Sequence, residues 1–241
     1  MTALARLPAT APRFSIVMPV LDEAPIIVAT LRALAPLRRQ GTELIVVDGR
    51  SADGTASLAA RWADRVVVSA PGRARQMNAG AALARGEVFV FLHADTVFPP
   101  LALQAIDAAL GAKFGHGGRR PLWGRFDVDI DGPGRLLKVV AALMNWRSRL
   151  TGIATGDQAI FVTRLAFDAV GGFPEQPLME DIELSRRLLR VGAPACIRAR
   201  VTTSGRRWQS RGAWRTILLM WRLRLLYRLG VGAERLARSY R

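Results

Sequence analysis

The sequence predicts an α/β fold in which a doubly wound, mainly parallel sheet is followed by a helical C-terminal appendage. Short apolar runs alternate with helical patterns four times within the first 92 residues, and turn-forming residues separate them. This alternation is typical of a parallel sheet with helices on both faces. A chain of 241 residues is long enough for one such core and an appendage.

The first predicted strand covers residues 14–20, and a helix follows it. Asp22 and Glu23 supply acidic residues before the helix, and Pro25 suits its first turn. Apolar residues then recur at helical spacing up to Leu34. We expect Pro36 to end this helix, because proline lacks the N–H that continues it.

The next elements follow the same pattern. Strands are predicted at residues 43–47, 65–69 and 87–92. Helices are predicted through Leu58 and Trp62 and over residues 73–84. The last of these strands is apolar throughout, which is expected when both faces of a sheet are covered.

The second half of the chain is less regular. Strands are predicted at residues 125–130 and 158–162, and helices at residues 135–150, 164–170 and 181–191. In the first of these strands, apolar and charged residues alternate, which predicts one buried and one exposed face. Residues 111–121 contain four glycines and several basic residues and are predicted to form a mobile basic loop.

Composition excludes several classes of protein. The formal net charge is +16, but the arginines are scattered along the chain, whereas a nucleic-acid-binding protein would concentrate them. The single Cys196 cannot form an internal disulfide, which favours a reducing, cytoplasmic setting. No segment has the roughly 18–20 uncharged apolar residues of a membrane span, and no signal peptide is recognised. We expect an N-terminal tail at residues 1–13, a catalytic domain at residues 14–205 and a basic, apolar helical segment at residues 206–241.

Polar residues follow the ends of the predicted parallel strands. Asp22 and Glu23 follow the first strand, and Asp48 ends the second. His93 and Asp95 follow the fourth. Ligands of open parallel sheets bind at this edge, although each acid could also serve as a helix cap or turn former. The dinucleotide motif G-x-G-x-x-G and the P-loop are both missing, so side chains and a metal would have to hold a bound diphosphate.

An ordered series of motifs makes the chain resemble the family 2 glycosyltransferases of the GT-A fold. The motifs lie at residues 18–23, 46–55, 72–80, 91–96, 171–173 and 180–181. The resemblance extends from about residue 14 to residue 208. The variants His93-Ala94-Asp95 and Gly156-Asp157-Gln158 look most similar to a bacterial branch named for its association with radical-SAM and selenodomain proteins. The resemblance implies transfer of a sugar from a nucleotide-diphosphate donor.

The resemblance also implies a metal-dependent donor site. Asp95 and His93 correspond to the family's D-x-D motif, which holds Mn²⁺ or Mg²⁺ against the departing diphosphate. His93 replaces the first acid of that motif. It could bind the metal directly or through water, contact phosphate, or be a core histidine bonded to a carbonyl. The other donor-binding candidates are Pro19, Val20, Glu23, Asp48, Arg73, Asn78 and Ala94, of which Arg73 could equally be a solvated residue at a helix start.

Glu180 and Asp181 are the candidate catalytic pair. Considered alone, they are acids in the first turn of a helix, where the helix dipole favours negative charge. The resemblance makes Asp181 the general base that deprotonates the acceptor hydroxyl, with Glu180 shaping the acceptor site. A single base without a covalent nucleophile implies inversion at the anomeric carbon. Further candidates for acceptor contacts are Asp157, Gln158, Arg207 and Trp208.

Two positions depart from the family pattern. Gly49 stands where many relatives have a second acid that contacts the nucleotide base, so the base stays open. Ser204 stands where processive polysaccharide synthases have a glutamine, which favours the addition of a single sugar. A nucleotidyltransferase on the same architecture is the main alternative, although it would have a glycine-rich loop with a basic residue after the first strand.

Residues 214–229 predict a helix that is too rich in arginine to span a bilayer. Its tryptophans, tyrosine and arginines suit a membrane interface, which would favour a lipid-linked acceptor and the inner face of the cell membrane. Arg215 and Arg222 share one side of this helix. Arg224 and Arg228 lie roughly opposite. The helix could therefore contact a membrane, or instead pack on the catalytic domain or on a second copy of the chain.

Overall fold

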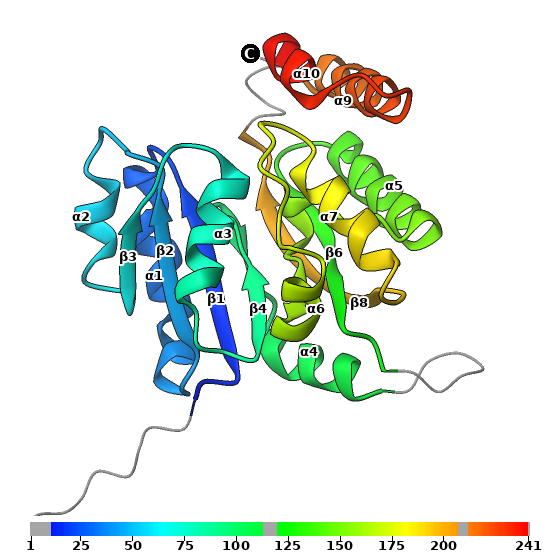
Figure 1. Ribbon diagram of the computed structural model, residues 1–241. Helices are drawn as coiled ribbons and strands as arrows, with labels where there is room; N and C mark the ends of the chain where they lie inside the picture. Colours follow the sequence, from blue (N-terminus) through cyan, green and yellow to red (C-terminus); the bar gives the residue numbers. More distant parts are fainter. Residues whose placement is uncertain (1–10, 113–119, 207–211, 241) are drawn as a thin grey trace, which may run out of the picture.

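The computed structural model describes residues 11–112, 120–206 and 212–240, and in them a mixed sheet of eight strands is flanked by helices (Figure 1). The strand order is β3-β2-β1-β4-β7-β6-β8-β5. The strands are β1 (Phe14–Val20), β2 (Glu43–Asp48), β3 (Arg65–Val68), β4 (Val88–Phe91), β5 (Thr96–Val97), β6 (Trp123–Asp131), β7 (Phe161–Thr163) and β8 (Ala195–Ser204). The α-helices are α1 (Ala24–Arg39), α2 (Thr55–Ala59), α3 (Arg73–Leu83), α4 (Ala102–Gly111), α5 (Arg135–Thr151), α6 (Arg164–Ala169), α7 (Glu180–Leu189), α9 (Ala213–Arg228) and α10 (Ala233–Tyr240).

The first four strands form the parallel half of the sheet. β1 pairs in parallel with both β2 and β4, and β2 pairs in parallel with β3. The register places Val20 opposite Asp48, so β1 and β2 end at the same edge of the sheet. The loops after these strands therefore meet, as the sequence predicts. β7 enters the sheet antiparallel to β4 and β6.

Hydrophobic layers cover both faces of the sheet. Leu31 of α1 and Ile106 of α4 are buried in one layer. Met77 of α3, Phe167 of α6 and Leu184 of α7 are buried in the other. Helices on both sides of a sheet define the doubly wound architecture that the alternating elements predict.

The prediction that Pro36 ends the first helix is wrong, because α1 continues to Arg39. The backbone N–H of Gln40 donates to the carbonyls of Pro36 (3.2 Å) and Leu37 (3.0 Å), which closes the last turn. Leu37 also packs against the core. The free energy gained by burying the last turn therefore offsets the loss of the one hydrogen bond that proline cannot donate.

Two other predicted elements are shorter than expected. α2 ends at Ala59, because the N–H groups of Trp62 and Ala63 both donate to the Ala59 carbonyl and tighten the chain into a turn. β7 begins only at Phe161, because a 3₁₀ turn, η1 (Gly156–Gln158), occupies the residues before it.

The prediction that β6 has one exposed face is also wrong. Arg125 is 0% exposed and Asp127 is 8% exposed, because α5 covers the face that carries these charges. The Arg125 guanidinium pairs with Asp127 and donates to the Asn145 carbonyl (3.2 Å). Arg149 Nη2 lies 2.7 Å from the other Asp127 oxygen. The alternating charges thus belong to a buried ion-pair network, the form in which buried charges are tolerated.

The sequence analysis did not predict β8 or α4. β8 runs parallel to β6 and pairs on its other side with β5. Arg198 and Arg200 interrupt its apolar pattern, which hides the strand in the sequence. α4 packs Leu103 and Ile106 into the core, but its alanine-rich sequence gives only a weak periodic signal.

The C-terminal helices α9 and α10 pack against the rest of the fold near the start of α7 (Figure 1). Leu223 of α9 and Leu236 of α10 are 1% and 2% exposed and contact Met179 and Ile182. None of the described helices combines the length and the apolar content needed to cross a bilayer.

Candidate active site

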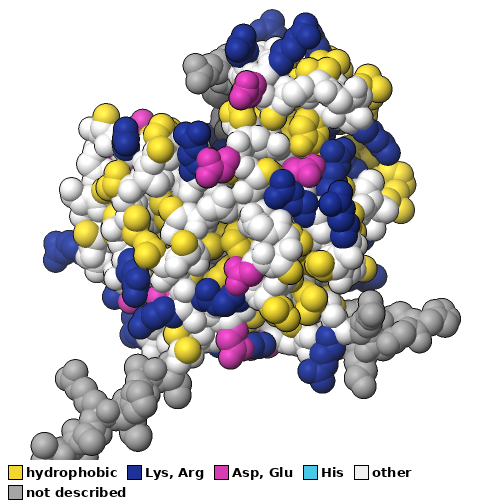
Figure 2. All heavy atoms as spheres, viewed as in Figure 1, with side chains coloured by type: hydrophobic (Ala, Val, Ile, Leu, Met, Phe, Trp, Pro, Cys, Tyr) yellow, Lys and Arg dark blue, Asp and Glu magenta, His cyan; other side chains and the backbone are white. Residues whose placement is uncertain are grey.

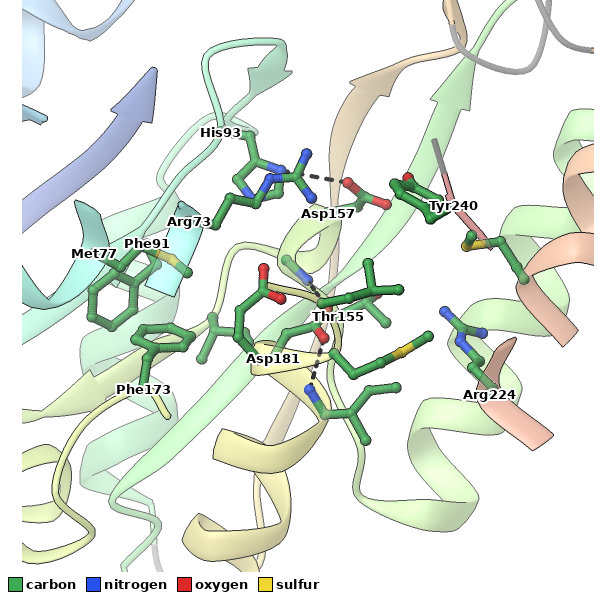
Figure 3. A pocket seen from close by; sticks show the side chains of 17 residues that line it. Arg73, Met77, Phe91, His93, Thr155, Asp157, Phe173, Asp181, Arg224 and Tyr240 are labelled. Carbon is green, nitrogen blue, oxygen red and sulfur yellow. Dashed lines mark hydrogen bonds and ion pairs between the residues drawn. The ribbon is translucent and has the colours of Figure 1, made fainter. Parts of the chain in front are cut away.

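A pocket opens between the end of β4, the turn η1, the first turn of α7 and the C-terminal helices (Figure 3). Five of the residues singled out in the sequence line it, although they come from four separate segments. They are Arg73, His93, Asp157, Glu180 and Asp181. The fold thus gathers the candidate catalytic pair and part of the candidate donor and acceptor sets around one cavity.

Asp181 is held firmly at this pocket. Its Oδ1 accepts a hydrogen bond from the N–H of Ile182 (2.7 Å), and its Oδ2 accepts one from the N–H of Gly156 (2.9 Å). Met179, the residue before α7, has φ +66°, a left-handed conformation that is strained for a side-chain-bearing residue. This backbone turn places both acids of the pair at the start of the helix and beside the pocket.

Glu180 is the more buried member of the pair, with 7% exposure. Burial raises the pKa of its carboxyl, and the negative charge of Asp181 raises it further, while Arg73 acts in the opposite direction. The two neighbouring carboxyl groups therefore differ in environment. The protonated form is more favourable for Glu180 than for an ordinary glutamate, whereas Asp181 is held by two backbone N–H donors.

Arg73 begins α3 and faces the three pocket acids. Desolvation acts to lower the pKa of its guanidinium, but Glu180, Asp157 and Asp181 raise it, and the net shift is upward. Arg73 is thus a permanent positive charge on the pocket wall, which suits contact with a phosphate.

His93 faces a carboxylate rather than a core carbonyl. Its Nδ1 lies 3.5 Å from Oδ1 of Asp157, and its side chain is 13% exposed. A Cβ at Gly156 would lie 2.6 Å from Cε1 of His93, so the imidazole packs directly on the η1 backbone. The interpretation of His93 as a core histidine therefore loses its basis.

The residue types near the end of β4 fit a divalent cation, but they provide only part of a coordination sphere. Asp95 is half-buried after β4, and its carbonyl accepts from the N–H of Ser204 (3.1 Å), which ties this turn to β8. Within residues 11–112, 120–206 and 212–240, no three His, Cys, Asp or Glu side chains gather closely enough to hold a metal ion. A cation bound by Asp95 or His93 would complete its sphere with phosphate oxygens and water, which Mg²⁺ often does.

Several donor-binding candidates lie at or just beyond the ends of β1, β2 and β4 rather than on the pocket wall. Asp48 is 2% exposed, and its two oxygens accept from the hydroxyl (2.5 Å) and the N–H (2.9 Å) of Ser51. Pro19, Val20 and Ala94 have buried side chains, so only their backbone could meet a ligand. Glu23 pairs with Arg206 at 3.3 Å.

The structure does not bring Asn78 into the pocket. Its side-chain Nδ2 donates to the carbonyl of Phe173 (2.8 Å), and its Oδ1 accepts from the N–H of the same residue (2.9 Å). Both ends of the amide are therefore used to hold the loop after α6. Phe173 in turn packs edge-on against Phe91 on the pocket wall.

Gln158 is fully buried, which argues against the predicted contact with an acceptor. Its Oε1 accepts from the N–H of Thr155 (3.1 Å), which closes the η1 turn, and its amide nitrogen reaches the carbonyl of Phe126 (3.5 Å). Gln158 thus shapes the turn that presents Asp157. Arg207 and Trp208 lie outside the described residues.

Four contributors to this region were not predicted. Gln76 is buried between the strand ends, where its Nε2 donates to the carbonyls of Val20 and Val47 (both 2.8 Å). Met220 and Arg224 of α9 and Tyr240 of α10 line the pocket (Figure 3). No local pattern marks these three, because they reach the site only through the packing of the C-terminal helices.

Comparison with known proteins supports the fold. Residues 15–113 match the family described as Glycosyl transferase family 2. No curated protein matches the chain. Among solved structures, the mannosyltransferase PcManGT from Pyrobaculum calidifontis, in complex with GDP-Man and Mn²⁺, is 23% identical, with a TM-score of 0.58; the match covers 83% of this chain and 59% of that one.

Two other solved structures are similar. S. aureus TarS 1–349 in complex with UDP-GlcNAc is 15% identical, with a TM-score of 0.59, and the match covers 80% of this chain and 58% of that one. Glucosyl-3-phosphoglycerate synthase from Mycobacterium tuberculosis, in complex with Mn²⁺, UDP and phosphoglyceric acid, is 20% identical, with a TM-score of 0.54 and coverages of 81% and 70%. The predicted GT-A fold is confirmed, while the chain spans less than two thirds of the length of the first two structures.

Proposed function

We propose that the protein is an inverting, metal-dependent glycosyltransferase that moves a sugar from a nucleotide-diphosphate donor to a hydroxyl acceptor. The observation that carries this proposal is the fixed Asp181 carboxylate beside a pocket that also contains Arg73 and His93. The family 2 match over residues 15–113 and the donor complexes of the similar structures support it. The variants at residues 93–95 and 156–158 support placement in the radical-SAM-associated branch.

The donor would bind along the carboxyl edge of the parallel strands, with its diphosphate toward Arg73 and His93. Asp95 and His93 are the residues that would hold a divalent cation. When bound, such a cation neutralises the charge that develops on the departing nucleoside diphosphate. Arg73 supplies a second, permanent positive charge to the same group.

Asp181 is the proposed general base. Each of its oxygens already accepts one backbone N–H, which fixes the carboxylate but leaves lone pairs for an acceptor hydroxyl. The acceptor oxygen attacks the anomeric carbon while its proton passes to Asp181. Burial makes the protonated form of Glu180 more favourable than in an ordinary glutamate, and in that form its carboxyl can donate a hydrogen bond to the acceptor.

A panel of donors tests this proposal. Nucleoside diphosphates and nucleotide sugars are added to the full chain with and without Mn²⁺, and the melting temperature is measured. A ligand at a hundred times its Kd adds about 2.7 kcal/mol of stability. We expect at least one nucleoside diphosphate to stabilise the protein, and more strongly with Mn²⁺. Absence of stabilisation by every nucleotide would reject the proposal.

A surface feature suggests where the acceptor is found. Trp214, Leu218, Trp221, Leu225 and Leu229 recur every three or four residues on α9 and are 58–72% exposed. We call these five residues the outer stripe. They lie on the side of α9 opposite the buried Thr216 and Leu223, so this helix is apolar on two sides.

Arginines flank the outer stripe. Arg215 and Arg222 border it on one side and Arg228 on the other, whereas Arg224 faces the pocket. The arginines that look scattered in the sequence therefore frame an outward apolar face. On the neighbouring helix α5, a second row of apolar side chains is 50–66% exposed, and Ile217 of α9 packs against the α5 cluster. That second row consists of Val139, Leu143, Trp146 and Leu150.

We propose that this face contacts an anionic lipid surface, and that the acceptor is lipid-linked. Tryptophans and leucines flanked by arginines match the apolar boundary and the charged headgroups of such a surface. The net charge of +16 adds long-range attraction. Figure 2 shows that basic side chains are spread over the visible face, with hydrophobic side chains on the C-terminal helices at the top.

A further inference from the structure

A partly enclosed cation interacts electrostatically with Asp181 and Arg224 of the pocket. Arg147 projects from α5, and two of its guanidinium nitrogens, Nε and Nη2, are enclosed without a hydrogen-bond partner in the described structure. Burying a charged donor without a partner is costly, and folded proteins seldom leave such groups unsatisfied. The neighbouring Arg125 also has an enclosed Nε without a partner, but its guanidinium is paired with Asp127, whereas Arg147 has no ion pair among the described residues.

The charges around Arg147 add to this cost. Burial, together with the positive charges of Arg224 and Arg125, lowers the pKa of Arg147 to about 10, while Asp181 acts in the opposite direction. Asp181 does not neutralise Arg147 by direct contact, since no hydrogen bond or ion pair joins the two side chains in the described structure. The region therefore has more positive than negative charge.

Arg224 connects this buried cation with the pocket. It reaches the cavity from α9, beside the wall that carries Asp181 (Figure 3). Among the hydrogen bonds and ion pairs of the described residues, none involves Arg224. Two guanidinium groups close enough to repel each other thus lie next to the proposed general base, and both have donors to spare.

We infer that Arg147 and Arg224 form a subsite for a phosphoryl group of the acceptor. Guanidinium groups bind phosphate through paired, charge-assisted hydrogen bonds, and a dianionic phosphate would neutralise both. The subsite would hold a phosphorylated compound with its free hydroxyl near Asp181. The inference rests on the proposed function, because it names the chemical class of the acceptor for the same site.

A binding experiment tests the subsite without requiring the sugar to be known. The probes are sn-glycerol 3-phosphate and, as its uncharged counterpart, glycerol. They are titrated calorimetrically into the full chain saturated with Mn²⁺ and the nucleoside diphosphate that stabilises it most. We expect only the phosphorylated probe to bind. Arg147→Gln and Arg224→Gln should each weaken that binding by at least about tenfold, the usual scale for losing a hydrogen bond to a charged group.

The control is Arg190→Gln, which removes one exposed arginine at the far end of α7 and should change the affinity less than about twofold. A second arm replaces the soluble probe with vesicles that contain phosphatidic acid, compared with vesicles of equal charge made with phosphatidylglycerol. Sensitivity of this arm alone to Arg224→Gln would assign the phosphate to a lipid. Sensitivity of the soluble arm would assign it to a free phosphorylated compound.

Three results would overturn the inference: no binding in either the soluble or the vesicle arm, equal binding by wild type and both variants in both arms, or competition with the nucleoside diphosphate. Competition would mean that the arginines serve the donor. Failure of the proposed function is a separate observation, since the wild type would then bind no nucleoside diphosphate at all. If Arg147→Gln fails to fold, Arg224→Gln still decides, because Arg224 is only partly buried.

Discussion

The backbone contacts of Asp181 explain why a residue in the first turn of a helix can also serve as a base. Asp181→Asn keeps the side-chain volume but removes the proton acceptor. We expect kcat to fall by at least about a hundredfold, the scale of general-base catalysis, while the Kd for the donor nucleotide stays the same. Steady-state kinetics and calorimetry measure the two quantities.

Glu183→Gln is the matched control for that variant. Glu183 lies two residues further along α7 and pairs with Arg186 and Arg187 on the surface of the helix, away from the pocket. We expect its turnover to be close to that of the wild type. Near-normal turnover of Asp181→Asn itself would reduce Asp181 to a residue that stabilises the start of α7.

The metal proposal depends on Asp95. Its side chain is half-buried at a strand end, and the contact of its turn with β8 runs through the backbone, so Asp95→Ala should leave the fold intact. We expect the variant to lose the additional stabilisation by Mn²⁺ seen with the donor nucleotide. Asp168→Ala, at an exposed position on α6, is the control. Thermal melting checks both, and an unchanged Mn²⁺ effect in Asp95→Ala would reject this ligand.

The protonation of Glu180 predicts a pH-dependent stability. Since its pKa in the folded protein lies above the ordinary value of 4.5, the unfolded chain loses this proton first as the pH rises. Glu180 therefore lowers the free energy of unfolding progressively from about pH 4.5 up to its folded pKa. Glu180→Gln should be more stable than the wild type at pH 8, and the difference should shrink at pH 4.

Urea unfolding at the two pH values measures this difference. Glu234→Gln, an exposed change on α10, should track the wild type at both. A Glu180→Gln variant that is less stable than the wild type at pH 8 would show that the ionised carboxylate, paired with Arg73, is the stabilising form.

At the scale of single elements, Leu223 anchors the C-terminal helices. It is 1% exposed and packs with Met179, Ile182 and Leu236, whereas Leu225 on the same helix is 58% exposed. Leu223→Ala should lower the free energy of unfolding of this region by about 2–5 kcal/mol, the usual cost of a core cavity. Leu225→Ala should change it by less than about 0.5 kcal/mol.

Hydrogen exchange of α9 and α10 measures the loss locally. Because these helices form one wall of the pocket, Leu223→Ala should also raise KM for the acceptor more than for the donor. Equal exchange protection in the two leucine variants would show that the C-terminal helices are held by other contacts.

The elements that were predicted correctly are those whose signal is local. Apolar runs that end in turn residues gave β1 to β4 in their order, and the polar residues after them met at one edge. β6 was misjudged because pairing with Arg149 allows Asp127 to be buried, and a one-dimensional pattern does not show partners. β8 was missed because Arg198 and Arg200 occupy exposed positions in it. These two charged residues break the apolar pattern that would mark a strand.

The candidate site shows the same contrast between residues with a local signal and residues that only tertiary contacts reveal. The sequence analysis identified Arg73, His93, Glu180 and Asp181. Each lies in a motif of the family pattern, and the motifs follow one another in the expected order along the chain. Gln158 was misassigned, because a buried polar residue that closes a turn looks like a ligand contact in the sequence. Arg224 and Tyr240 reach the pocket from 43 and 59 residues beyond Asp181 along the chain, and only tertiary packing reveals them. Propensity and periodicity predict elements, whereas the contacts between distant segments decide which residues share a cavity.

At the scale of the whole molecule, the packing of α9 settles the orientation that its sequence left open. Its inner face contacts the catalytic domain, so the interpretation as a packed helix is correct for that face. The outer stripe remains exposed, together with the apolar row on α5. Exposed apolar rows of this kind mark a surface for lipid or for another protein.

Flotation with vesicles tests the lipid proposal. The full chain should float with phosphatidylglycerol vesicles at low salt, and much less with phosphatidylcholine vesicles or at high salt, because screening weakens the attraction of the arginines. Leu218→Glu and Trp221→Glu place a charge in the outer stripe and should each reduce vesicle binding by at least about tenfold, given the 1.5–3 kcal/mol gained by burying such a side chain. Leu165→Glu, on α6 and 75% exposed, is the matched control and should bind as the wild type does.

If the wild type stays unbound at low salt and sedimentation instead shows a dimer that Trp221→Glu dissociates, the outer stripe is an interface between two copies of the chain. A water-soluble acceptor would then replace the lipid-linked one in the proposed reaction.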